Sequence, residues 1–87
     1  MVEVLTEWGL YVFDGQVLEI FQPNGKSQRI HILFIKEAKL EQNRKGKLEL
    51  WVDFEQKSLK TPPVGIPNEN VSQAQALSDA INRAKNA

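Results

Sequence analysis

Residues 10–21 constrain the fold more than any other part of this 87-residue chain. Two apolar, β-prone runs, residues 10–13 and 16–21, are joined by Asp14-Gly15, a dipeptide that favours a two-residue type I′ turn. Such a turn can join only antiparallel strands, because parallel strands need a connection of a dozen or more residues. The segment therefore predicts an antiparallel β-hairpin with Asp14 at its tip.

Three more strands are expected after this hairpin. Pro23-Asn24-Gly25 predicts a turn, and residues 28–32 form a strand with Ile30 and Ile32 on one face. The apolar residues between 33 and 40 fit either one helical turn or a strand with Ala38 and Leu40 facing inward, and we prefer a strand over residues 35–42. The polar residues 43–46 then predict a tight hairpin into a strand over residues 47–55. The strands thus lie between about residues 10 and 55.

The last of these strands contains the sequence LELWVDFE at residues 48–55, which alternates apolar and polar positions. Trp51 shares the polar face with Glu49, Asp53 and Glu55. Large aromatic side chains are usually covered, so a tryptophan on a wet face needs an explanation. Two explanations stay open: the loop through Pro62 to Ile66 folds over Trp51, or Trp51 contacts a partner chain.

The remainder of the chain predicts a long loop and one helix. Pro62, Pro63 and Pro67 exclude a central strand or a helix from residues 56–69. Asn70 is expected to cap a helix over residues 71–85, with Gln73 completing a capping box. Apolar residues recur there at helical spacing and include two anchors for packing on a sheet, Leu77 and Ile81.

Three segments together resemble the short bacterial pleckstrin-homology-like (PH-like) domains: VFDGQVLEI, RIHILFIKEAKLE and AQALSDAINRA. The resemblance covers residues 9–86 and departs from the family pattern at His31, where proline is frequent. It implies a single α+β domain over residues 1–87, mainly β with one C-terminal helix. Its antiparallel meander would form a partly open barrel of five to seven strands, capped by the helix.

Composition excludes several classes of function. Eleven Lys and Arg balance eleven Asp and Glu, so no global field attracts nucleic acid or an anionic membrane. The chain has no cysteine, which excludes disulfides and thiolate zinc sites. Glu3 and Glu7 stand where a signal peptide carries cations, and no apolar run approaches the ~20 residues that span a bilayer. We expect a cytoplasmic protein.

The sequence offers little for catalysis. His31 is the single histidine, and Asp53 and Glu55 are the one carboxylate pair at a spacing that acid/base catalysis could use. A solvated strand face explains that pair better, because nothing nearby in the sequence would exclude water. Motifs for binding a metal ion or a phosphate group are absent. We therefore expect no enzyme activity, no cofactor and no metal.

The expected function is a non-catalytic PH-like module for protein interaction or self-association. Since the proline-rich loop replaces the last barrel strands, the edge of the strand over residues 47–55 should be partly unpaired and open to an added strand. The predicted contact residues for a protein, a peptide or a second copy are Trp51, Leu59, Val64 and Ile66.

Two alternative functions remain. Arg44, Lys45 and Lys47 could bind anionic lipid as part of a peripheral membrane module, although Glu41 and Glu49 flank them. The acidic first hairpin lacks the cations with which PH-like lipid binders hold a phosphorylated head group. A small enzyme accessory domain, using His31 and the carboxylate face, is the weaker alternative.

Overall fold

The computed structural model describes residues 1–56 and 61–86. Within these residues the chain forms seven strands, two 3₁₀ turns and one α-helix. The strands are β1 Val2–Thr6, β2 Gly9–Phe13, β3 Val17–Phe21, β4 Ser27–His31, β5 Ile35–Gln42, β6 Leu48–Phe54 and β7 Val64–Gly65. The 3₁₀ turns are η1 Ile32–Phe34 and η2 Asn68–Asn70, and the helix is α1 Val71–Lys85.

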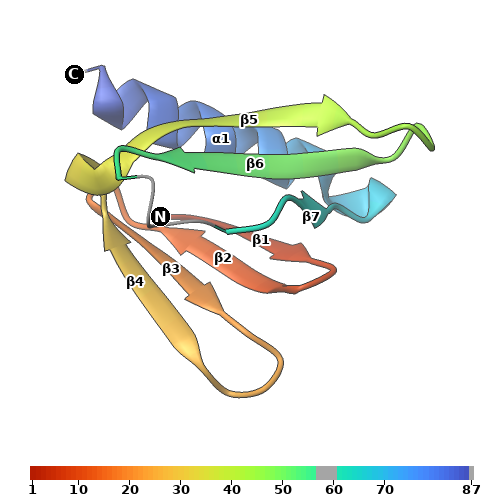
Figure 1. The fold of residues 1–87 in the computed structure, drawn as a ribbon, viewed down its shortest axis with the longest axis horizontal. Coiled ribbons are helices and arrows are strands. Elements are labelled where there is room, and N and C mark those ends of the chain that lie inside the picture. Colours follow the sequence, from red (N-terminus) through yellow and green to blue (C-terminus); the bar gives the residue numbers. More distant parts are fainter. Residues whose placement is uncertain (57–60, 87) are drawn as a thin grey trace.

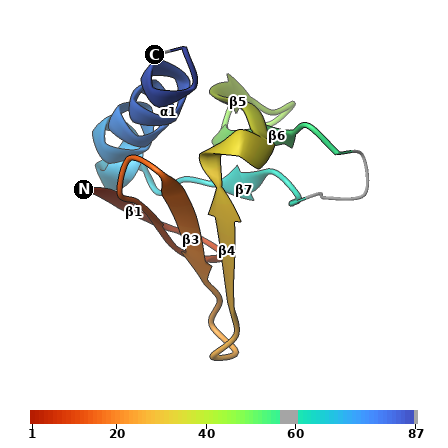
Figure 2. The ribbon, with the colours of Figure 1, turned by 90° about the vertical axis from the view of Figure 1, so that its left-hand side faces the viewer.

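The strands form two separate antiparallel sheets (Figure 1). Sheet A has the order β1-β2-β3-β4, and sheet B has the order β5-β6-β7. The helix packs against β5 and β1, so it covers the gap between one edge of each sheet (Figure 2). The prediction of a mainly β, α+β chain with one C-terminal helix is confirmed. Among the described residues no ladder joins the two sheets, so the barrel is not closed.

The core lies between the two sheets and the helix, and it follows the predicted periodicities. Leu50 and Val52 are buried, as the alternation in β6 predicts, and Leu77 and Ile81 anchor the helix. Bulky side chains that are almost wholly buried come from all three layers: Tyr11, Phe13, Leu18, Ile20, Ile35, Leu50, Ile66, Leu77 and Ile81. Burial of this apolar surface supplies the main favourable term in folding.

Two strands lie outside the predicted range of residues 10–55. β1 pairs with β2 from Val2↔Phe13 to Thr6↔Gly9, and its alternate residues Val4 and Thr6 are buried. Its pattern is visible in the sequence, but no turn dipeptide marks its end. Gly9 follows the turn with φ +147°, and a side-chain carbon there would lie 2.2 Å from the carbonyl oxygen of Phe21. β7, with two residues, is the other addition.

The predicted type I′ turn at Asp14-Gly15 is wrong by one position. The Asp14 N–H donates to the Val17 carbonyl at 3.3 Å, so Gly15 and Gln16 are the central residues. Of these two residues only Gly15 has positive φ, at 103°, which is the pattern of a type II′ turn. Oδ1 of Asp14 accepts from the Gln16 and Val17 N–H groups, both at 2.8 Å. These bonds lower the pKa of the Asp14 carboxyl and hold it beside the turn.

The helix has the predicted bounds, but its start differs from the prediction. Asn70 makes no side-chain cap; its Nδ2 instead donates to the Leu5 carbonyl at 2.9 Å. The predicted capping box with Gln73 is therefore absent. The third predicted strand also ends earlier, because Nδ1 of His31 accepts from the Leu33 N–H at 3.2 Å and caps η1.

Candidate functional site

Trp51 lies on the central strand of sheet B and is half-buried. Its cross-strand neighbour is Lys39, whose Nζ is 5.9 Å from the centre of the indole ring. The indole Nε1 is buried and has no hydrogen-bond partner among the described residues. A buried indole N–H usually finds an acceptor. Trp51 is thus partly covered, and its one polar group lacks a partner within residues 1–56 and 61–86.

An open hollow of about 820 Å³ lies beside Trp51. One wall is β6 from Trp51 onward, and the opposite wall is the described part of the proline-rich loop, at residues 61–63. Lys36 and Glu55 also line it. The described part of the loop therefore borders a hollow next to Trp51. From the sequence, two alternatives were open for Trp51: cover by this loop, or contact with a partner chain.

The ladder between β6 and β7 is short. It pairs Glu49 with Gly65 and Leu50 with Val64, and the Ile66 N–H donates to the Leu48 carbonyl at 3.0 Å. Continuing this register would place Pro62 opposite Val52. Proline has no N–H to donate, so the ladder cannot continue there.

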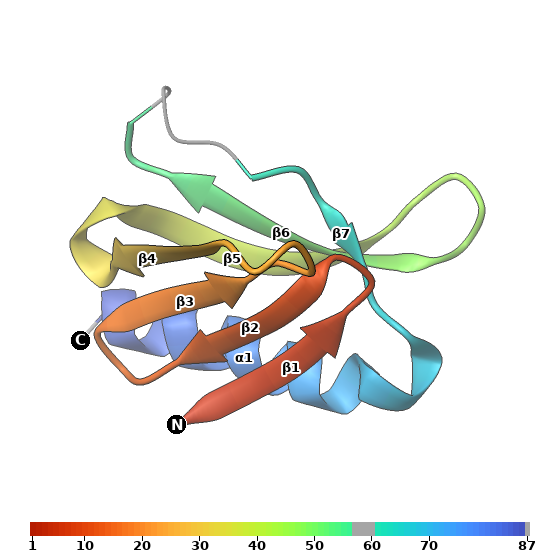
Figure 3. The same ribbon diagram turned by 90° about the horizontal axis from the view of Figure 1, so that it is seen from below.

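On the side of the hollow, the end of β6 has backbone groups without a ladder partner among the described residues. Because neighbouring residues of a strand point their backbone groups to opposite edges, Leu48, Leu50, Val52 and Phe54 all face the β7 side. Among the described residues, no ladder partner follows Leu50 on that side. Figure 3 shows β6 separating from the chain that leads into β7. Within residues 1–56 and 61–86, the ladder on this edge of β6 thus covers Glu49 and Leu50 and does not extend to Val52 or Phe54.

The outer face of sheet B carries paired carboxylates around Trp51. The register places Glu41 opposite Glu49 and Glu37 opposite Asp53, on either side of the Lys39–Trp51 pair. Lys39 forms an ion pair with Glu41 at 3.2 Å. That hydrogen bond and the charges of Glu41, Asp53 and Glu37 raise the pKa of Lys39. The face around the indole ring is therefore electronegative.

The other predicted contact residues do not join this surface. Val64 and Ile66 are 4% and 1% exposed and belong to the hydrophobic core, so their side chains are not available to a partner. Leu59 lies outside the described residues. Of the predicted set, Trp51 remains.

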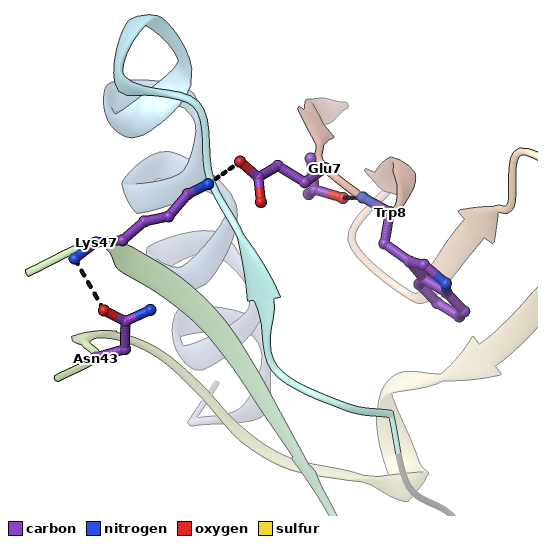
Figure 4. Close-up of polar contacts among 5 residues, drawn as sticks. Glu7, Trp8, Asn43 and Lys47 are labelled. Atoms are coloured by element: carbon purple, nitrogen blue, oxygen red, sulfur yellow. Dashed lines mark hydrogen bonds and ion pairs between the residues drawn. The ribbon is translucent and has the colours of Figure 1, made fainter. Parts of the chain in front are cut away.

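The basic turn between β5 and β6 is a separate feature. Oδ1 of Asn43 accepts from the Lys45 and Lys47 N–H groups at 2.9 and 3.0 Å and shapes the turn. The Lys47 ammonium forms an ion pair with Glu7, from the β1–β2 connection (Figure 4). In the part of the chain that the structure describes, Arg44 and Lys45 are exposed and form no ion pair. Of the three predicted lipid contacts, one is thus engaged within the protein.

The predicted catalytic candidates do not come together around the hollow. Asp53 and Glu55 line it, whereas His31 does not. Glu55 pairs with Lys85 of the helix at 3.5 Å. Over residues 1–56 and 61–86, no group of three or more acidic or histidine side chains could hold a metal ion. Within the same residues, α1 lacks the length and apolarity needed to cross a bilayer.

Comparisons with known proteins add no family or relative. No protein-family model, curated protein or solved structure matches this chain significantly. The candidate site therefore rests on geometry: a half-buried indole, an open strand edge and two opposed carboxylate pairs. The spacing of the prolines was the signal in the sequence for the edge of β6 without a ladder partner. The pairing of the carboxylates could not be predicted in this way, because it depends on the register between β5 and β6.

Proposed function

We propose that this chain is a non-catalytic PH-like domain that binds an extended segment of a protein partner, or of a second copy, beside Trp51. The order of seven antiparallel strands and one C-terminal helix supports the PH-like assignment, together with the resemblance in sequence. One observation carries the binding proposal. The β6–β7 ladder stops at Leu50, directly before a half-buried tryptophan that lines an open hollow.

The physical basis is strand addition. A free strand edge offers N–H and C=O groups in register, and an extended segment can satisfy them with its own backbone. Proteins blunt or use such edges because unpaired ones attract other chains. Here the backbone groups of Val52 and Phe54 point to the β7 side and have no ladder partner there among the described residues, and Trp51 adds a large apolar contact of the type that dominates interface energetics.

The edge next to the helix is a poorer site for strand addition. Ala38 of β5 donates its N–H to Oδ1 of Asn82 at 2.9 Å, and its carbonyl accepts from Nδ2 of Asn82 at 2.7 Å. The Ser78 hydroxyl donates to the same carbonyl at 2.9 Å. A segment entering between β5 and the helix would have to replace all three hydrogen bonds. The free end of β6 has no such obstacle among the described residues.

Membrane binding and an enzyme accessory role have less support. Exposed Arg44 and Lys45 would add about 1 kcal/mol each at an anionic surface, too little for stable attachment. Lys47 is engaged with Glu7. His31 caps η1 and does not line the hollow, so no acid/base pair forms there with Asp53.

The experiment is selection from a displayed library of random, flexible peptides, with counter-selection against Trp51→Ala. We expect peptides that bind the wild type, shift the backbone amide resonances of Val52 and Phe54, and lose binding in Trp51→Ala. Phe21→Ala is the matched control, because Phe21 is an exposed aromatic residue on the other sheet. Sedimentation velocity of the same proteins tests self-association through this surface.

One result would contradict the proposal, and another would change the role of Trp51 in it. Binding that survives Trp51→Ala but is lost in Phe21→Ala would move the contact surface to sheet A. Unfolding of Trp51→Ala, seen by circular dichroism, would make Trp51 part of a second internal core. In that case the amide shifts of Val52 and Phe54 in the wild type still decide whether the edge binds peptide.

A further inference from the structure

Resting on the proposed function, we infer that the bound segment is basic and that one of its arginine or lysine side chains lies against Trp51, beside Asp53. The inference concerns the chemistry of the partner, which strand addition alone leaves open. Three observations carry it, namely the opposed carboxylates, the position of Lys39 and the lining of the hollow, together with the side-chain alternation of any added strand.

The opposed carboxylates are unfavourable in the isolated chain. Like charges directly opposite each other destabilise an antiparallel pair, and β5 and β6 contain two such pairs, Glu41↔Glu49 and Glu37↔Asp53. Lys39 serves Glu41. Among the described residues, Glu37, Glu49 and Asp53 have no ion-pair partner. A cation from outside would relieve this repulsion.

Lys39 shows which kind of group the indole face accepts. Its ammonium lies 5.9 Å from the ring centre, within the range of a cation–π contact. Its pKa is raised by the Glu41 hydrogen bond and by the charges of Glu41, Asp53 and Glu37. The protein therefore already stabilises one positive charge next to Trp51. The negative potential of these carboxylates also acts on the other positions around the indole ring.

The hollow offers a place for a second cation that Lys39 does not fill. Trp51 and Asp53 line it, and Lys39 does not. Lys36 also lines it, while Glu55 is paired with Lys85. Of the carboxylates that line the hollow, Asp53 is therefore the one without an ion-pair partner among the described residues, and it marks where a guanidinium or ammonium group would be bound.

An added strand would direct a side chain to this position. Trp51 and Asp53 share the outer face of β6, two residues apart. A residue of the added strand opposite either of them would place its own side chain on the same face. Its neighbours would meanwhile pair their backbone with Val52 and Phe54. Backbone pairing and the cation contact are therefore compatible within one extended segment.

The test uses two fluorescein-labelled peptides, one of alternating threonine and arginine and one with every arginine replaced by citrulline. Citrulline keeps the shape of arginine and removes its charge. From the size of cation–π and ion-pair contacts, we expect the arginine peptide to bind about tenfold more tightly in fluorescence anisotropy. Asp53→Asn should remove most of that difference without weakening the citrulline peptide. Trp51→Ala should weaken both peptides.

Glu3→Gln is the matched control, because Glu3 is an exposed carboxylate on β1, in the other sheet. It should leave both affinities unchanged. Asp53→Asn should fold, since it removes one member of a like-charge pair. A weakening of the arginine peptide by Glu3→Gln equal to that by Asp53→Asn would show non-specific attraction and overturn the inference.

The remaining outcomes separate the inference from the proposed function. If the two peptides bind equally and both depend on Trp51, the charge preference is wrong and strand addition at this edge stands. If neither peptide binds and the displayed library yields no Trp51-dependent peptide, the proposed function fails together with the inference. If library peptides depend on Trp51 but show no enrichment of arginine or lysine, the inference alone is overturned.

Discussion

Tyr11→Phe tests the packing of the core between the two sheets. Tyr11 lies on β2, is 1% exposed, and its hydroxyl has no hydrogen-bond partner among the described residues. Burial raises the pKa of this phenol to about 12, because the charged form would lose its hydration. The substitution removes the hydroxyl and keeps the aromatic ring.

The pH dependence has a definite sign and size. The folded state holds the phenolic proton up to a pKa of about 12, whereas the unfolded chain releases it at an ordinary pKa of about 10. The associated stability is fully present below pH 10 and is lost as the pH rises toward 12. A difference of two pKa units corresponds to about 3 kcal/mol of unfolding free energy. Tyr11→Phe should not show this loss.

At neutral pH the same substitution should be neutral or stabilising by about 1 kcal/mol, because an unpaired buried hydroxyl is unfavourable. Urea unfolding from neutral pH to about pH 11 measures the unfolding free energies of the wild type and of Tyr11→Phe. The difference between these two free energies gives the contribution of Tyr11, because the contribution of lysines, which titrate in the same pH range, is common to both proteins and cancels. The chain has one tyrosine, so tyrosinate absorbance reports this residue alone. The reasoning would be refuted if the unfolding free energies of the two proteins changed with pH in parallel. It would also be refuted if Tyr11 in the folded protein titrated near the ordinary tyrosine pKa.

Three further substitutions or assays test other parts of the structure. Asn82→Ala removes both hydrogen bonds to Ala38 and should lower the unfolding free energy by about 2 kcal/mol, while Asn82→Asp, which sets a carboxylate oxygen against the Ala38 carbonyl in place of the amide donor, should lower it at least as much; a smaller loss for Asn82→Asp in urea unfolding would contradict the hydrogen-bond pairing. Gly15→Val should cost about 1–2 kcal/mol, because φ at Gly15 is 103°; an unchanged denaturation midpoint would make the turn assignment wrong. In vesicle pelleting, phosphoinositides should retain the protein no better than other anionic lipids of equal charge; a preference for one head group would favour a membrane role for Arg44 and Lys45.

The amino-acid sequence by itself determined the regular elements with a clear period. The strand over residues 35–42 and the helix over residues 71–85 have the predicted bounds, and the inward and outward faces of β6 follow its alternation. These features depend on side-chain direction along one element, which local backbone geometry sets. The same alternation placed Trp51 on the outer face, so the central residue of the candidate site was predictable. The strand β1 carries a readable pattern too, but it is short and lacks a turn dipeptide.

The tertiary structure alone decided what surrounds Trp51. The opposed carboxylates depend on the register between β5 and β6, which is regular from Glu37↔Asp53 to Gln42↔Leu48 and shifts only beyond Glu37, toward Ile35. The burial of Val64 and Ile66 depends on the pairing of β7 with β6 across a loop whose length does not specify that register. The start of the helix likewise depends on Leu5, because Asn70 donates to its carbonyl instead of capping locally. Each of these contacts joins residues distant in sequence, and their geometry is set by the packing of whole sheets, which no local pattern encodes.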